Sequence, residues 1–109
     1  MTNNAEFSSQ FLNVTHETGE AFWPMPLPVE LRASLDSPVA DLANIGERMG
    51  GMLVAGLFLK DFVSDELPWL HLDIAGPAFN ESQPHGYTPV GGTGVAMRSL
   101  VQLAVVASS

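Results

Sequence analysis

Along the chain, segments with hydrophobic residues at helical spacing alternate with short apolar runs. The connecting segments between them are rich in proline and glycine. Asn3 or Asn4 can cap a helix near the start of the chain. This helix would run to about Thr18, where Gly19 stops it. Its apolar side chains lie mostly at helical spacing and predict a buried stripe: Phe7, Phe11, Leu12 and Val14.

The positions of the prolines and of the apolar runs predict three further helices. The prolines of residues 24–28 predict an extended connector, because proline fits neither a helix interior nor a paired central strand. Pro28 suits the first turn of a short helix over residues 29–35. Residues 48–63 are apolar nearly all round, so we expect a helix that is buried on most sides. A last helix is expected over residues 95–107.

Two short strands are predicted between these helices. One spans residues 41–45 and ends at Gly46, and the other spans residues 69–74. Residues 77–89 are a long loop without periodicity. Alternating helices and short strands indicate an α/β fold. Because two or three short strands make a poor independent sheet, we expect the chain to complete a sheet that other residues supply.

Composition changes this picture in one respect. Of the 109 residues, 46% are hydrophobic, which is enough for a core, but only 15% are charged. Soluble domains usually contain roughly 25% charged residues. We interpret the deficit as a sign that the chain lies largely inside a larger assembly. The alternative is an isolated domain that is merely apolar.

Charge and cysteine content exclude several classes of function. The net charge is −8 with only four basic residues, so neither a nucleic-acid partner nor a polybasic membrane surface is expected. The longest apolar stretches, at residues 52–59 and 103–107, are shorter than the about 20 residues of a membrane span. The chain has no cysteine, which excludes disulfides and thiolate sites and fits a reducing cytoplasm.

Two local patterns are candidates for chemistry. His71 and Asp73 share one face of the predicted strand and could bind a metal ion, but no second cluster supplies further ligands. We favour a structural role in which Asp73 is hydrogen-bonded and holds the following turn. Residues 91–94 could cradle an anion, or form the turn that leads into the last helix, which we favour. Several acidic residues beside turns are expected to be solvated: Glu20, Glu30, Asp36 and Glu47.

Four segments occur in a characteristic order along the chain. They are residues 19–27 (GEAFWPMPL), 40–46 (ADLANIG), 69–76 (WLHLDIAG) and 91–94 (GGTG). In sequence and order they resemble the leucyl aminopeptidase family of dinuclear metalloaminopeptidases, over the C-terminal part of its three-layer α/β/α catalytic domain. One departure is Val95-Ala96, where that family commonly has Arg-Pro.

The resemblance implies that residues 1–109 are an incomplete domain, the C-terminal segment of the peptidase catalytic domain. The family binds two divalent metal ions, zinc or manganese, through upstream motifs such as NTDAEGR, and this chain contains none of them. We therefore expect no catalytic residue, no metal ligand and no hydrolysis by the chain alone. In that family, the NIG isoleucine and residues after LDIA line the pocket for the first side chain of the substrate. The corresponding positions are Ile45, Ala75 and Ala78.

The function implied for the parent protein is metal-dependent release of N-terminal amino acids, with a leucine-like preference, from peptides. The implied partners are the rest of the catalytic domain, peptide substrates and further copies in a cytoplasmic homo-hexamer. Two alternatives remain open from the sequence: a non-catalytic fragment or interaction module, and an unrelated small α/β binding domain.

Overall fold

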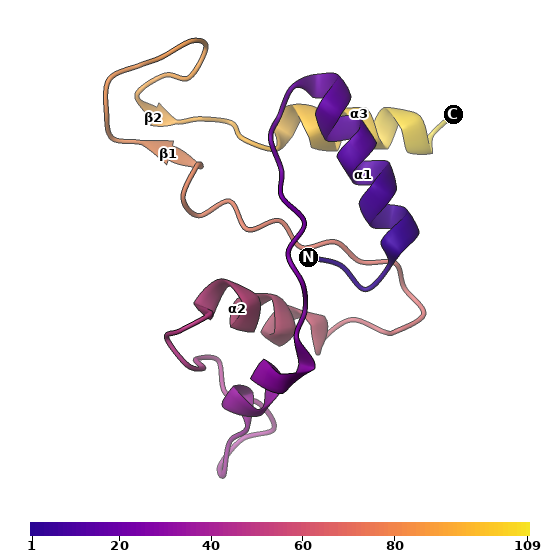
Figure 1. Cartoon of the computed structure of the whole chain (residues 1–109), viewed down its shortest axis with the longest axis vertical. Helices are drawn as coiled ribbons and strands as arrows, with labels where there is room; N and C mark the ends of the chain where they lie inside the picture. The colour runs from indigo at the N-terminus through magenta and orange to yellow at the C-terminus, as the bar shows by residue number, and fades with distance from the viewer. The chain divides into compact units, whose positions relative to one another are not determined.

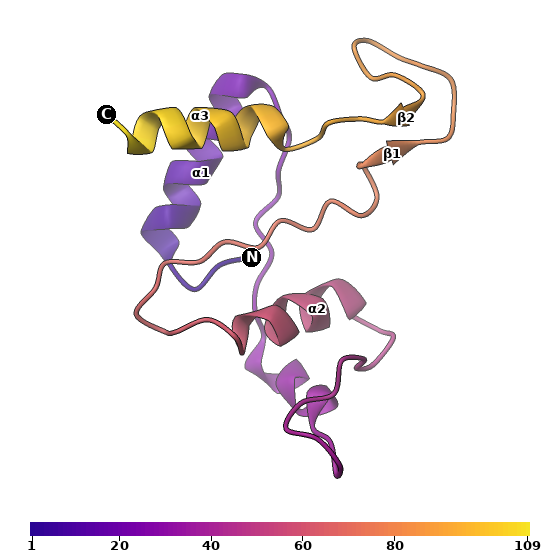
Figure 2. The same cartoon turned by 180° about the vertical axis from the view of Figure 1, so that it is seen from behind.

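The computed structural model describes residues 1–109, and the chain divides into two compact units. Unit 1 comprises Met1–Ser8 and Trp23–His71, and unit 2 comprises Ser9–Phe22 and Leu72–Ser109. The elements are drawn from opposite sides in Figures 1 and 2. In chain order they are α1 (Ala5–Thr18), the 3-10 helix η1 (Val29–Leu35), α2 (Gly51–Lys60), β1 (Phe79–Asn80), β2 (Gly91–Gly92) and α3 (Met97–Ala107). None of the helices combines the length and hydrophobicity needed to cross a membrane.

Helix α1 has the bounds and the cap that the sequence predicts. The Oδ1 atom of Asn4 accepts a hydrogen bond from the Phe7 N–H at 2.8 Å, which satisfies one of the free donors of the first turn. The helix ends before Gly19, whose φ of +72° is a conformation that glycine adopts without strain. Of the predicted stripe, Phe11 and Val14 are buried, whereas Phe7 and Leu12 are half-buried. The bounds and the cap are confirmed, and the stripe is confirmed in part.

Unit 1 is built around the packing of α2 against η1, which lie side by side in Figures 1 and 2. The core consists of Leu35, Val54 and Leu57, each at most 6% exposed. Partly buried apolar side chains surround it: Leu27, Leu31, Leu42 and Phe58. An ion pair of 2.7 Å between Arg32 Nη2 and Asp61 Oδ2 joins η1 to the end of α2. The predicted extended connector and the short helix of residues 29–35 are confirmed.

Helix α2 is shorter than predicted and less buried. It begins after Gly50, whose φ of +76° interrupts a helix, and it ends at Lys60 rather than at residue 63. Within this chain it buries one face, with Val54 and Leu57 inside, while Leu59 is 40% exposed. The prediction of burial on most sides is wrong for this chain, because η1 and its neighbours cover only one side of the helix.

Both predicted strands are absent. Within residues 41–45, the Ala43 N–H donates to the Leu35 carbonyl at 2.8 Å, and no strand forms. Within residues 69–74, Leu70 makes a single antiparallel bridge with Thr2. A strand needs a ladder of such bonds with a neighbour, and neither segment has one in this chain. The sequence pattern identified apolar runs, but the runs lack partners here.

The sheet pairs a part of the predicted loop of residues 77–89 with the glycine-rich segment that follows it. Strands β1 and β2 pair antiparallel, with Phe79 opposite Gly92 and Asn80 opposite Gly91. The connecting segment is braced by Asn80, whose Nδ2 atom donates to the Pro89 carbonyl at 3.0 Å. The loop prediction is therefore wrong at residues 79–80, and the turn prediction is wrong at residues 91–92, because two-residue strands are too short to leave a periodic pattern.

Unit 2 contains the rest of α1, this hairpin and α3. The Phe11 ring packs edge-on against Phe22 at 5.2 Å between centroids. Helices α1 and α3 cross in both views of the chain, and the Thr18 and Ser99 hydroxyls lie 2.9 Å apart at the crossing. Helix α3 begins two residues later than predicted, because Ala96 takes a φ of +71° that no helix interior allows.

Neighbouring side chains lie so close to Gly46 that a larger residue at this position tests the packing of unit 1. A Cβ atom there would lie 2.6 Å from Cγ1 of the buried Val54 and 2.7 Å from Oγ of Ser34. Gly46→Ala should lower the free energy of unfolding by about 1 to 3 kcal/mol through overpacking. Urea denaturation followed by circular dichroism measures this.

Gly51→Ala is the matched control, since a Cβ atom there meets nothing within 4 Å and the residue starts a helix. We expect no loss of stability, and a gain of up to about 1 kcal/mol. Equal midpoints for the Gly46→Ala variant and the unmodified chain would contradict the tight packing.

Candidate functional site

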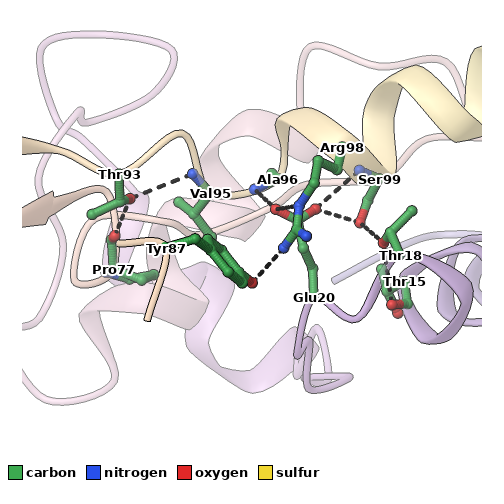
Figure 3. A network of polar contacts seen from close by, with 10 residues as sticks. All are labelled: Thr15, Thr18, Glu20, Pro77, Tyr87, Thr93, Val95, Ala96, Arg98 and Ser99. Carbon is green, nitrogen blue, oxygen red and sulfur yellow. Dashed lines mark hydrogen bonds and ion pairs between the residues drawn. The ribbon is translucent and has the colours of Figure 1, made fainter. Parts of the chain in front are cut away.

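A buried carboxylate organises unit 2. Glu20 follows the end of α1, and its side chain is only 6% exposed. Figure 3 shows it pointing at the start of α3. There Oε1 accepts the Ala96 N–H at 3.0 Å, and Oε2 accepts the Ser99 N–H at 2.9 Å and the Ser99 hydroxyl at 2.5 Å. A negative charge is favourable at this end of a helix, where N–H groups lack helical partners.

Arg98 and Tyr87 extend this network. The Arg98 Nε atom lies 3.8 Å from Oε1 of Glu20, and its Nη2 atom donates to the Tyr87 hydroxyl at 2.5 Å. The guanidinium carbon lies 4.5 Å from the centroid of the Tyr87 ring, within cation–π range. Burial acts to raise the pKa of Glu20, but the hydrogen bonds from Ser99 and Ala96 and the charge of Arg98 outweigh it and hold the pKa below its ordinary value.

The predicted solvation of Glu20 is therefore wrong, whereas Glu30, Asp36 and Glu47 are exposed as expected. Its partners lie 76 to 79 residues further along the chain, so no local pattern marks it as buried. The available signal was its place in the GEAFWPMPL segment, directly after the glycine that ends α1.

The glycine-rich segment leads into α3 as predicted, but its first half, Gly91–Gly92, is strand β2 rather than a turn. Thr93 donates its N–H to the Ala78 carbonyl at 3.0 Å and its hydroxyl to the Pro77 carbonyl at 2.6 Å. Gly94 follows with a φ of +70°. The N–H groups of Ala96 and Ser99, which could have faced an anion, are bonded to Glu20. This occupancy disfavours the anion-cradle alternative.

The structural role favoured for Asp73 is confirmed. Its Oδ1 atom accepts the Ala75 N–H at 3.2 Å and so holds the turn that follows. His71 stacks on Trp69 with 6.0 Å between ring centroids. No group of three or more His, Cys, Asp or Glu side chains in the structure could hold a metal ion. The residues present therefore do not fit a dinuclear metal centre.

The three residues proposed to line a substrate pocket lie in different units. Ile45 belongs to unit 1, is 81% exposed and borders an apolar hollow of about 570 Å³ beside α2. Ala75 and Ala78 belong to one turn of unit 2, in which the Ala78 N–H donates to the Ile74 carbonyl at 3.0 Å. Ala75 is exposed and Ala78 is half-buried. Their role in a pocket stays a prediction.

A second hollow, of about 600 Å³, lies within unit 2. Its wall includes Glu20 and Arg98 from the network, Tyr87 from the hairpin, and Pro77 and Thr93 beside the turn. Every buried polar side-chain atom has a hydrogen-bond partner. The charged groups of this hollow are bonded mainly to neutral partners, Glu20 to Ala96 and Ser99 and Arg98 to Tyr87, and these bonds tie the end of α1 and the hairpin to the start of α3.

The family profile described as "Cytosol aminopeptidase family, catalytic domain" matches residues 1–101. A probable cytosol aminopeptidase of Streptomyces griseus is 61% identical over 104 residues, which are 95% of this chain and 20% of that protein. The chain belongs to the cytosol aminopeptidase family. It spans about a fifth of the length of the curated relatives it matches.

Solved structures agree with this assignment. The bottromycin maturation enzyme BotP in complex with Mn superposes with a TM-score of 0.93 at 40% identity, over 99% of this chain and 24% of that one. The cytosol aminopeptidase of Coxiella burnetii superposes with a TM-score of 0.84 at 36% identity, over 95% of this chain and 22% of that one. The predicted α/β class and the leucyl aminopeptidase resemblance are confirmed. An unrelated α/β binding domain is excluded, and an interaction module is not favoured.

Proposed function

We propose that the protein to which this chain belongs is a metal-dependent aminopeptidase that releases N-terminal amino acids from peptides. The observation that carries the proposal is the match of residues 1–101 to the catalytic domain of the cytosol aminopeptidase family. Identity of 61% to a curated member supports a shared reaction. We further propose that residues 1–109 are the C-terminal segment of that catalytic domain.

The segment would supply scaffold and part of the pocket for the first side chain of the substrate. We assign the wall to Ile45, Ala75 and Ala78. Each of the three has an apolar side chain, and an apolar wall would bind an apolar side chain of the substrate chiefly by removing it from water. A leucine-like preference follows from that apolar, uncharged wall.

The proposed metal ions are two divalent cations, zinc or manganese, held by parts of the protein outside this segment. The absence of a ligand cluster in residues 1–109 motivates that division. Manganese in the BotP structure supports a divalent ion for a relative of this chain.

The proposed setting is a cytoplasmic homo-hexamer in which the rest of the catalytic domain covers this segment. Large apolar side chains stand exposed on the chain: Trp23 is 85% exposed, Val39 92% and Met49 83%. Where such side chains form a contiguous patch, that patch marks a contact with another protein surface. The low charged content of 15% supports the same interpretation.

The proposal predicts a division of activity between two proteins. The purified 109-residue chain should not hydrolyse leucine p-nitroanilide with added manganese or zinc, since it has no metal-ligand cluster. A longer protein that ends in this segment and carries the NTDAEGR motif should hydrolyse it. Steady-state assays of both proteins under one set of conditions make the comparison.

Two results would contradict the proposal. One is a longer protein, correctly folded and metal-loaded, that hydrolyses no amino-acid amide. The other is stoichiometric, tight binding of two metal ions to the 109-residue chain in titration calorimetry, which would overturn the division between segment and metal centre.

A further inference from the structure

We infer that Thr93 is a positioning residue that fixes the turn carrying Ala75 and Ala78, and thereby sets the preference for the first side chain of the substrate. The inference rests on the proposed function, because it needs that turn to be a pocket wall. Thr93 itself would not touch the substrate. It would act through the backbone of Pro77 and Ala78.

The contacts of Thr93 give this role its geometry. The Thr93 hydroxyl donates to the Pro77 carbonyl at 2.6 Å, and the Thr93 N–H donates to the Ala78 carbonyl at 3.0 Å. Figure 3 shows the hydroxyl bond between Thr93 and Pro77 beside the start of α3. Two consecutive carbonyls of the turn are thus bonded to one residue, which determines both the position and the tilt of that peptide.

Thr93 can hold the turn because it is held on both sides. Before it, Gly92 pairs with Phe79 across the hairpin. After it, the Ala96 N–H is bonded to the buried carboxylate of Glu20. A fixed residue between two anchors can impose its geometry on the turn, whereas a mobile one would follow the turn instead.

The position of the turn matters for specificity because alanine offers a short, rigid surface. The side chain of Ala78 is a single methyl group, so its position is set by the backbone alone. The Ala78 N–H is bonded to the Ile74 carbonyl at 3.0 Å, which holds that backbone. A shift of about 1 Å in such a wall changes how well a leucine side chain is desolvated. An alanine side chain is too short to be affected to the same degree.

The test compares two variants of the longer, active protein. Thr93→Val removes the hydroxyl but keeps the shape and the N–H, and Thr93→Ser keeps the hydroxyl. The measured quantity is the ratio of kcat/KM for leucine p-nitroanilide to that for alanine p-nitroanilide. Thr93→Val should change this ratio by about threefold to tenfold, the range that corresponds to one net hydrogen bond. For Thr93→Ser, the same ratio should stay within about twofold of the wild-type value.

Thr18→Val is the matched control, since Thr18 belongs to the same network through Ser99 but does not touch the turn. It should leave the ratio unchanged. A purely structural role for Thr93 would reduce the amount of folded enzyme and lower both activities equally. If Thr93→Val does not fold, Thr93→Cys, whose thiol is a weaker donor, should give a ratio between those of Thr93→Ser and a lost bond.

The outcomes separate the inference from the proposed function. Wild-type enzyme that hydrolyses both substrates, with Thr93 variants at an unchanged ratio, would overturn the positioning role and leave the function intact. Wild-type enzyme that hydrolyses neither substrate would overturn the function, and the inference with it. A changed ratio in Thr93→Val that Thr93→Ser restores supports both.

Discussion

Replacing Glu20 with alanine is expected to lower the free energy of unfolding of the chain by about 3 kcal/mol. The substitution leaves the N–H groups of Ala96 and Ser99 without their acceptor at the start of α3. It also removes the negative charge that lies beside the Arg98 guanidinium. Because the side chain is 6% exposed, water cannot readily replace these bonds. Urea denaturation of the purified chain measures the loss.

Two variants control for this result. Glu20→Gln keeps one oxygen acceptor, so we expect about half of the loss. Glu30→Ala removes an exposed carboxylate and should change stability by no more than about 0.5 kcal/mol. If Glu20→Ala and Glu30→Ala had equal effects, the buried network would not stabilise the fold.

The same carboxylate makes stability depend on pH in a known direction. The folded protein holds the pKa of Glu20 below its ordinary value of 4.5. The unfolded chain therefore binds more protons between the two values, so stability rises with pH in that window. The contribution of Glu20 is fully present above pH 4.5 and is lost as the pH falls through the lower, folded value. The difference in stability between wild type and Glu20→Gln should shrink over that range.

Enlarging Ala78 to phenylalanine in the longer, active protein is expected to lower kcat/KM for leucine p-nitroanilide by about 100-fold. The added ring would fill the space that the proposed pocket leaves beside the turn, and it would displace a branched side chain. Alanine p-nitroanilide should lose less than about tenfold, because its methyl group needs little of that space. Steady-state kinetics with both substrates measure the two losses.

Ala33→Phe provides the matched control, because Ala33 is an exposed alanine in η1. It should leave the ratio of the two substrates unchanged. Equal losses for both substrates in Ala78→Phe would instead remove Ala78 from the pocket wall, since a general loss of activity indicates misfolding or a distant effect.

The elements that local sequence could predict are those whose stabilising contacts are local. Asn4 caps α1 by accepting the N–H of Phe7, three residues later, and Gly19 ends that helix. Asp73 accepts the N–H of Ala75, two residues later. The family could also be identified from four short segments in order, because their residues are specific even where their conformation is not. Hydrogen bonds over two to four residues depend on little else in the chain.

Tertiary structure alone decided the rest. The segments at residues 41–45 and 69–74 have the apolar character of strands but no ladder in this chain, since a strand is defined by its neighbour. Glu20 looks like a solvated turn residue, yet it is buried because α3 brings Ala96 and Ser99 to it from 76 and 79 residues away. Sequence determined helices α1 and η1, the turn at Asp73 and the family, whereas long-range packing determined which polar groups hold the turn of the proposed pocket.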